Sequence, residues 1–382
     1  LATAPFDRTA RVWEVSKSQE RVLVHDAVVR DLAFAPDGRT IATASFDNTV
    51  RMWDVRSGHK HAEPLKHEDL VSAVVLSPDG RAVAIAPFDK TARIFDIATG
   101  QERVLPHEET VKAVIFSPDS RTLATASLDN TVRMWDVVSG HEQGVLIHQA
   151  PVTTMAFSHD AGALASASDD NTIRIWDVLT KKERSRRVVQ VTINALAFSP
   201  DGHTLASTSG DTTARIWDVA TGEELAPLTH QNSLPQIAFS PDGRTLATAS
   251  DDNTVRIWDV PTQQERLRLK HDGTVNGVSF SSDGRMLASA SDDKKARIWD
   301  VMTGEESAVF AHQDSVTIVA FSPDGRTMAS ALRDKTIHLV QIPPNEIWEL
   351  IVYARSKLPM GRTELSLSER EDMFFQSGKH GP

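Results

Sequence analysis

An aromatic residue followed by an acid recurs along this chain at nearly constant spacing. The aromatic position falls at Trp13, Trp53, Phe95, Trp135, Trp176, Trp217, Trp258 and Trp299, with a final Val340 in the place of the aromatic residue. Neighbouring positions are 40 to 42 residues apart. So regular a period requires a fold in which every repeat has the same structure and the same kind of neighbours.

Each repeat contains four short apolar runs separated by turn sequences. In the unit 107–146, strands are expected at 111–116, 123–127, 131–137 and 144–147. Four antiparallel strands make a small sheet whose two faces are both apolar, so the sheet must stack on neighbouring sheets. Radial stacking of such sheets closes a ring. The sequence therefore predicts an all-β fold, a β-propeller of four-stranded blades.

Composition excludes several classes of protein. The 382 residues include no cysteine, so disulfides and thiolate metal sites are unavailable. No run of apolar residues is long enough to span a membrane. A formal charge of −11 argues against broad binding to nucleic acid or anionic membranes. We expect a cytoplasmic protein.

Five repeats carry a His, a Ser or Thr, an Asp and a Trp at fixed spacing. The His precedes the Asp by 22 residues, the hydroxyl residue precedes it by 4, and the Trp follows it by 6. The sets are His25, Thr43, Asp47 and Trp53; His107, Thr125, Asp129 and Trp135; His148, Ser166, Asp170 and Trp176; His230, Thr248, Asp252 and Trp258; and His271, Ser289, Asp293 and Trp299.

Over residues 1–342 this pattern resembles the WD-repeat family of β-propellers. The resemblance implies that each of the five sets forms a hydrogen-bonded structural tetrad inside its blade. Three further sets depart from the pattern, with Ile85 and Phe95 in one, Val189 in the His position of another, and Val340 in the Trp position of the last. We expect Asp211, which lacks its His, to recruit water or a backbone donor instead.

The number of blades depends on how the ring closes. Seven complete blades follow from residue 28 onward, and the last three strands, near 315–342, can be completed by an outer strand at 20–24. This closure gives eight blades over residues 20–342 and is favoured. The alternative is seven blades closed by a strand near 62–66, with residues 1–55 belonging to a preceding propeller.

Both ends of the chain differ from the complete repeats. Residues 1–19 read as the second and third strands of a truncated repeat, so we expect the chain to be the C-terminal portion of something longer. After Pro343-Pro344, residues 343–382 have helical spacing of apolar residues and predict a short helical tail. This tail resembles the C-terminal ends of bacterial WD-repeat signalling proteins.

No catalytic, cofactor or metal motif is found in the sequence. A glycine-rich phosphate loop, a nucleophile elbow and a zinc-binding helix are all missing. The neighbouring His59, His61 and His67 are interpreted as part of a solvated turn. The basic run at 181–187 is interpreted as a solvated strand edge. We therefore expect no enzyme activity within this chain and no small-molecule substrate.

The loops at one face of the ring carry the clearest functional signal. The resemblance implies that partners dock where chains enter the first strand and where the second strand joins the third. The residue before each tetrad Asp lies there, in the order Phe46, Phe88, Leu128, Asp169, Gly210, Asp251, Asp292 and Arg333. Three adjacent blades thus present large apolar groups, which are unusual on a surface unless a partner covers them.

These observations predict a protein or peptide site at Phe46, Phe88 and Leu128, with Arg30 and Lys112 as flanking contacts. The alternative is that the apolar side chains fold inward against their own loops. The predicted function is a non-enzymatic scaffold or sensor that binds a protein and neither nucleic acid nor membrane. The alternative function is a regulatory C-terminal propeller of a larger bacterial signalling enzyme, such as an NTPase, kinase or protease.

Overall fold

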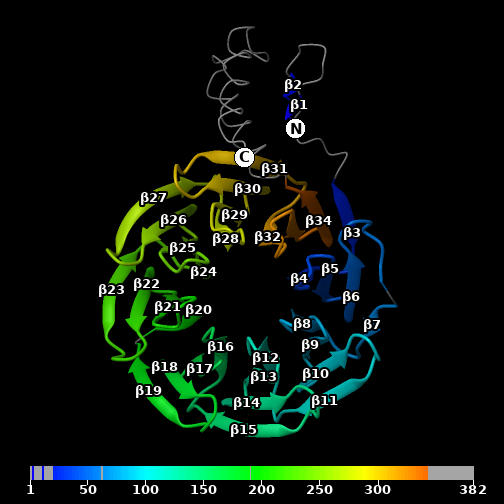
Figure 1. Ribbon diagram of the computed structural model, residues 1–382, viewed down its shortest axis with the longest axis vertical. Coiled ribbons are helices and arrows are strands. Elements are labelled where there is room, and N and C mark those ends of the chain that lie inside the picture. The colour runs from blue at the N-terminus through cyan, green and yellow to red at the C-terminus, as the bar shows by residue number, and fades with distance from the viewer. Residues whose placement is uncertain (1, 4–10, 13–19, 62, 190, 343–382) are drawn as a thin grey trace, which may run out of the picture. The chain divides into compact units, whose positions relative to one another are not determined.

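The computed structural model describes residues 2–3, 11–12, 20–61, 63–189 and 191–342. Val22–Leu339 forms one compact unit, in which eight four-stranded antiparallel sheets are arranged in a ring (Figure 1). In the N-terminal segment, β1 (Ala2–Thr3) pairs antiparallel with β2 (Arg11–Val12). The tail predicted for 343–382 lies outside the described residues. The described residues include no helix long and apolar enough to cross a membrane.

The blades follow one another along the chain. The first three blades consist of β4 (Val29–Phe34), β5 (Thr40–Ser45), β6 (Thr49–Asp54) and β7 (Leu65–Lys66); of β8 (Val71–Leu76), β9 (Ala82–Pro87), β10 (Thr91–Asp96) and β11 (Glu102–Pro106); and of β12 (Val111–Phe116), β13 (Thr122–Ser127), β14 (Thr131–Asp136) and β15 (Glu142–Ile147). The next two consist of β16 (Val152–Phe157), β17 (Ala163–Ser168), β18 (Thr172–Asp177) and β19 (Glu183–Val188), and of β20 (Ile193–Phe198), β21 (Thr204–Ser209), β22 (Thr213–Asp218) and β23 (Glu224–Thr229). The sixth and seventh consist of β24 (Gln236–Phe239), β25 (Thr245–Ala249), β26 (Thr254–Asp259) and β27 (Gln264–Lys270), and of β28 (Val275–Phe280), β29 (Met286–Ser291), β30 (Lys295–Asp300) and β31 (Glu306–Ala311).

The eighth blade joins strands from the two ends of the repeat region. Its strands are β32 (Val316–Phe321), β33 (Thr327–Leu332), β34 (Thr336–Gln341) and, on the outside, β3 (Arg21–Val24). The prediction of eight blades with a shared closing blade is confirmed. The seven-blade alternative is wrong, because β7 completes the first blade instead of closing a ring.

The hydrophobic core lies between blades. One cluster joins Ala84, Ala86 and Leu105 of the second blade to Leu123 and Trp135 of the third. Other clusters repeat this arrangement at neighbouring blade junctions. Alanines on the second strand of one blade leave room for the tryptophan of the next blade. A blade therefore buries its apolar surface only when it has neighbours.

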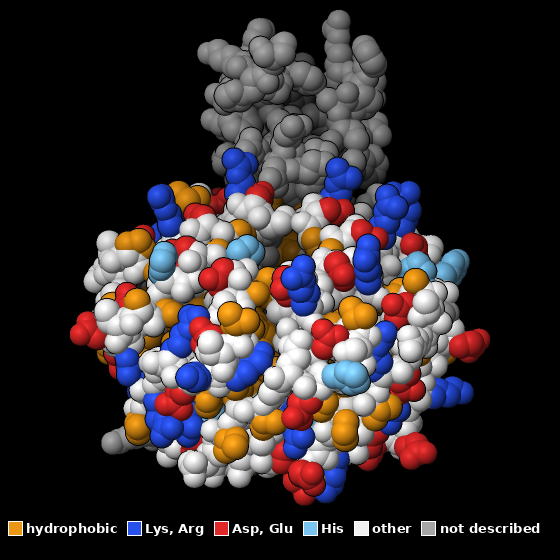
Figure 2. Space-filling model, turned by 60° about the horizontal axis from the view of Figure 1, so that its bottom comes forward, with side chains coloured by type: hydrophobic (Ala, Val, Ile, Leu, Met, Phe, Trp, Pro, Cys, Tyr) orange, Lys and Arg blue, Asp and Glu red, His pale blue; other side chains and the backbone are white. Residues whose placement is uncertain are grey.

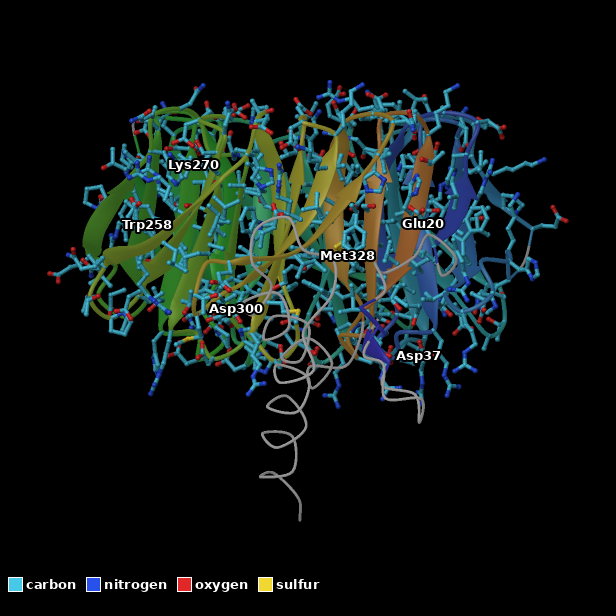
Figure 3. The ribbon with its side chains drawn as sticks, turned by 90° about the horizontal axis from the view of Figure 1, so that it is seen from above. Glu20, Asp37, Trp258, Lys270, Asp300 and Met328 are labelled. Atoms are coloured by element: carbon cyan, nitrogen blue, oxygen red, sulfur yellow. The ribbon has the colours of Figure 1, made fainter. Side chains whose placement is uncertain are left out.

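The ring has two faces with different loops. The crossover face carries the loops that lead from one blade to the next and the turns between second and third strands. The hairpin face carries the turns between first and second strands and between third and fourth strands. In Figure 3, Lys270 lies toward the crossover face, and Asp37 and Asp300 lie toward the hairpin face.

A carboxylate links the first two blades at their inner strands. Oδ2 of Asp31 accepts the backbone N–H of Val74 at 2.9 Å, and Oδ1 accepts that of Leu32 at 2.8 Å. Burial raises the pKa of Asp31 to about 6, although these two hydrogen bonds oppose the shift. The folded chain therefore holds this proton more tightly than the unfolded chain, and ionisation of Asp31 weakens the fold as the pH rises.

We expect Asp31→Asn to remove this loss of stability at neutral pH. Asparagine does not ionise, and its single oxygen can still accept the N–H of Val74, although its amide nitrogen cannot accept the N–H of Leu32. From about pH 4 to about pH 7, the wild type should lose up to roughly 3 kcal/mol of unfolding free energy relative to the variant. Urea unfolding of both proteins across this range measures the difference. A difference that does not change with pH would contradict the inference.

The closing strand offers a second test of the ring. Leu23 on β3 is 1% exposed and lies in the cluster with Trp53 and Ile337. Leu23→Ala should cost about 2–5 kcal/mol of unfolding free energy and increase amide hydrogen exchange in β32–β34. Leu146→Ala is the matched control. Leu146 is also 1% exposed and lies on an outer strand, but all four strands of its blade follow one another in the sequence. Equal exchange in β32–β34 for the two variants would argue against the closing role of β3.

Candidate functional site

Equivalent residues of all eight blades are fixed on the crossover face by the same hydrogen bond. The residue before each tetrad-position Asp donates its backbone N–H to a carbonyl in the loop that leads into the first strand. Phe46 donates to Val28 at 3.0 Å, and Phe88 donates to Leu70 at 2.9 Å. The same bond is made by Leu128, Asp169, Gly210, Asp251, Asp292 and Arg333. The backbone is thus held alike in every blade while the side chain varies.

The predicted apolar residues occupy equivalent positions of three adjacent blades on this face, and one of them has a cation beside it. Phe46, Phe88 and Leu128 are partly exposed, whereas Arg30 and Lys112 are exposed. The Nζ atom of Lys112 lies 5.9 Å from the ring centroid of Phe88, which belongs to the neighbouring blade. This distance permits a cation–π interaction. The apolar side chains are only partly exposed, which is less than the sequence suggested.

The opposite sector of the same face is acidic and hydrogen-bonded. Asp292 accepts hydrogen bonds from Thr274 at 2.9 Å and Asn276 at 2.8 Å. Burial works to raise the pKa of Asp292, but these bonds and the charge of Arg333 outweigh it and lower the pKa. Burial and the charge of Asp292 raise the pKa of Asp251. This sector is therefore anionic, unlike the sector with Phe46 and Phe88.

The structure brings the members of each predicted tetrad together. In the fourth blade, Nε2 of His148 lies 2.7 Å from Ser166 Oγ, and Nδ1 lies 3.2 Å from Asp170. The indole N–H of Trp176 donates to the same hydroxyl at 2.8 Å. The sets of His25 and His230 have matching distances. In the sets of His107 and His271, the His–Asp separations are longer, at 3.5 and 3.4 Å.

An arginine that the sequence reading missed extends these networks. Arg174 donates to Asp170 Oδ2 at 2.9 Å and to the carbonyl of Ile147 at 2.9 Å, which ties the third strand to the end of the preceding blade's outer strand, β15. Equivalent arginines pair with the tetrad Asp in other blades. The sequence does contain a signal for this arginine, because an arginine recurs two positions before the Trp of each tetrad. It was overlooked because the residue also fits an ordinary strand position.

The incomplete tetrads differ in whether the missing hydrogen bonds are replaced. Asp211, which faces Val189 where other blades have His, accepts hydrogen bonds from the Ser209 hydroxyl and from Arg215 at 2.6 Å. A backbone donor, the N–H of Thr213, is also present at 3.1 Å, but intact blades have this bond as well. Arg215 has counterparts in the intact blades, so the contact specific to this blade is the one from the Ser209 hydroxyl, whose equivalent Ser168 donates to a loop carbonyl instead. In the second blade, the buried ring nitrogens of His67 have no hydrogen-bond partner among the described residues.

The basic run on the fourth blade is largely neutralised. Arg184 pairs with Asp177 at 2.5 Å, and Arg186 pairs with Glu183 at 3.0 Å. Arg187 donates to the backbone carbonyls of Thr221 and Gly222. Figure 2 shows acidic, basic and hydrophobic side chains interspersed over the visible side of the ring. The geometry of this run matches the predicted solvated strand edge.

Comparisons with known proteins agree with this geometry. A family model described as the IFT122 first beta-propeller matches residues 104–264 and, in an overlapping match, 192–357. A second model, described as WD domain, G-beta repeat, matches residues 17–54. The chain belongs to the WD-repeat β-propeller family. This propeller is also similar to the crystal structure of the computationally designed Ika8 protein, with 26% identity and a TM-score of 0.74 over 84% of this chain and 98% of the other. No curated protein sequence gives a significant match.

The tetrads of this WD-repeat propeller resemble hydrolytic triads only in composition. Ser166 is fully buried, and its hydroxyl is held between His148 and Trp176, so it cannot reach a substrate. Burial lowers the pKa to about 4 in four histidines, namely His107, His148, His230 and His271. These histidines are therefore neutral at physiological pH. Their arrangement stabilises the blade and offers no nucleophile to solvent.

We expect this WD-repeat propeller to lose stability as the pH falls from 6.5 toward 4. The unfolded chain takes up protons on these histidines in that range, whereas the folded chain does not, so stability present above pH 6.5 is lost in acid. His148→Val imitates the fifth blade. It should lower the unfolding free energy by roughly 1–3 kcal/mol at neutral pH and reduce proton uptake on unfolding by about one.

Denaturant unfolding at several pH values measures both quantities. Val189→Leu is a suitable control, since it changes an apolar side chain at the same blade position without changing a titrating group. If His148→Val unfolds with the same pH dependence as wild type, the assignment of His148 as a buried neutral base is incorrect.

Proposed function

We propose that this propeller is a non-enzymatic interaction module that binds a protein or peptide on its crossover face. Phe46, Phe88 and Leu128 would supply apolar anchors in three adjacent blades. Arg30 and Lys112 would supply polar contacts beside them. WD-repeat propellers generally serve as protein-interaction scaffolds and are typically non-catalytic. A protein-binding site on this propeller agrees with that general role.

One observation carries the proposal. Eight equivalent backbone positions are held by the same hydrogen bond, yet only three adjacent blades have a large apolar side chain there. The turn itself does not require an apolar side chain, because Asp169, Gly210 and Asp251 occupy the same place in other blades. Aromatic side chains are enriched in protein interfaces relative to the rest of the surface. Phe88 is such a side chain, and Nζ of Lys112 lies 5.9 Å from its ring centroid.

The same face could act in a free scaffold or in a sensor region of a longer signalling protein. In both cases the partner would contact the apolar sector first. The acidic sector around Asp292 lies on the opposite side of the ring from the apolar sector. It would favour a partner that has basic groups on that side. The proposed role therefore depends on recognition of a protein surface and needs no chemistry by the propeller.

The test compares capture of partners by wild type and by Phe46→Asp/Phe88→Asp. Tagged proteins would be incubated with lysate of the source organism, and bound proteins would be identified by mass spectrometry. A partner retained by wild type should then be purified and its affinity measured. We expect the double variant to weaken binding by at least about ten-fold, because each anchor is replaced by a charged group at the interface.

The matched control is Asp169→Asn/Asp251→Asn, which changes the same turn position in two other blades. This control should bind the partner nearly as well as wild type. Circular dichroism and thermal melts must show that all three proteins are folded. Equal binding by wild type and the Phe46→Asp/Phe88→Asp variant would move the site away from the apolar sector and leave Phe46 and Phe88 as packing residues.

A further inference from the structure

A groove of about 1030 Å³ lies on the hairpin face, on the opposite side of the ring from the proposed site. It is formed by turns of the second, third and fourth blades, among them the turns that contain Asp79, Asp119, Val138, Asp160 and Leu179. Asp79 and Asp119 occupy the same turn position as Asp37, which Figure 3 places toward the hairpin face. The groove is large enough to accept several side chains of a bound peptide.

Two exposed apolar side chains stand at this groove. Val138 is 77% exposed and Leu179 is 89% exposed, at equivalent turn positions of adjacent blades. Each follows the Trp-Asp-Val sequence that ends the third strand of its blade. Because both line the same groove, a segment bound there would remove the two side chains from water together.

The cations that line the groove are mostly satisfied within the fold. Arg184 pairs with Asp177 at 2.5 Å, and Nζ of Lys181 donates to the carbonyl of Val178 at 2.5 Å. The stem of Lys181 lies against Gly144 of the neighbouring blade, where an added Cβ would be 3.0 Å from its Cγ. Lys181 and Arg184 therefore form part of the wall and are poorly placed to attract an acidic partner.

Of the five acids that the described residues contribute to the groove, three retain a free carboxylate oxygen, whereas both oxygens of Asp136 and of Asp177 accept hydrogen bonds. Oδ1 of Asp119 accepts the Ser117 hydroxyl and the N–H of Arg121, and Oδ1 of Asp160 accepts the Ser158 hydroxyl. The same geometry is found at Asp79. Within the described part of the chain, Oδ2 of these three aspartates makes no hydrogen bond. The hydrogen bond from Ser158 lowers the pKa of Asp160, so its carboxyl group is ionised at neutral pH.

We infer that this hairpin-face groove binds an extended peptide segment in which an arginine or lysine is flanked by aliphatic residues. The aliphatic side chains would cover Val138 and Leu179. The cation would reach the free oxygens of Asp119 and Asp160, which outnumber the remaining lining cation, Arg121. Charge complementarity selects a basic segment over an acidic one. This site goes beyond the proposed function, because it uses other residues on the other face.

The test is selection of a random displayed peptide library on the folded wild-type protein. Enriched peptides should combine a basic residue with neighbouring leucine, isoleucine or valine. A synthetic copy of the strongest peptide should bind about ten-fold more weakly to Val138→Asp/Leu179→Asp and to Asp119→Asn/Asp160→Asn. Its binding should also weaken as the salt concentration rises.

Two control variants separate this site from others. Met302 is 72% exposed at the equivalent turn of the seventh blade and does not line the groove, so Met302→Asp should bind the peptide like wild type. Phe46→Asp/Phe88→Asp should also bind it normally, and this result is independent of whether the crossover-face proposal holds. Thermal melts would establish that each variant is folded.

Three results would overturn the inference. The first is a selection that enriches no peptide, or enriches acidic ones. The second is peptide binding that the groove variants leave unchanged. The third is self-association of wild type that Val138→Asp/Leu179→Asp abolishes, measured by analytical ultracentrifugation, which would make a second copy of the chain the occupant.

Discussion

The packing of each blade against its neighbours is the constraint on which the rest of the structure depends. Trp135 of the third blade lies in one cluster with Ala84 and Ala86 of the second, and similar clusters occur at other junctions. A blade alone would leave both apolar faces in water, and an open row of blades would leave two such faces at its ends. The ring removes these ends by placing β3 beside β34.

This packing leaves the loops free to vary. The strands and tetrads fix where each turn begins, and a repeated backbone hydrogen bond fixes the turn itself, as at Phe46 and Asp251. Side chains in the turns then contribute little to the core, so an aromatic group in one blade and an acid in another are equally compatible with the fold. Stability therefore comes mainly from the strands, which leaves the turns free to carry binding residues.

Most of the fold could be predicted from the sequence, because every repeat carries the same pattern of strands and turns and so supports the same structure independently. The spacing of His148, Ser166 and Trp176 predicted a network that the distances reproduce closely. The replacement of the missing His beside Asp211 was harder to foresee, because Ser209 and Arg215 both have counterparts in intact blades and differ from them only in their hydrogen-bond partners. The groove at Val138 and Leu179 was also missed, because it exists only where turns of separate repeats meet.

The two proposed sites are physically connected through the third blade. Leu128 immediately precedes the turn into β14, and Val138 follows the end of that strand, so one strand joins the crossover face to the hairpin face. Six residues of extended chain span roughly 20 Å. Because β14 lies between β13 and β15 and its Met134 is fully buried, this span cannot change without disrupting the blade. Partners on the two faces would thus be held at a fixed separation, which is the property that a scaffold requires.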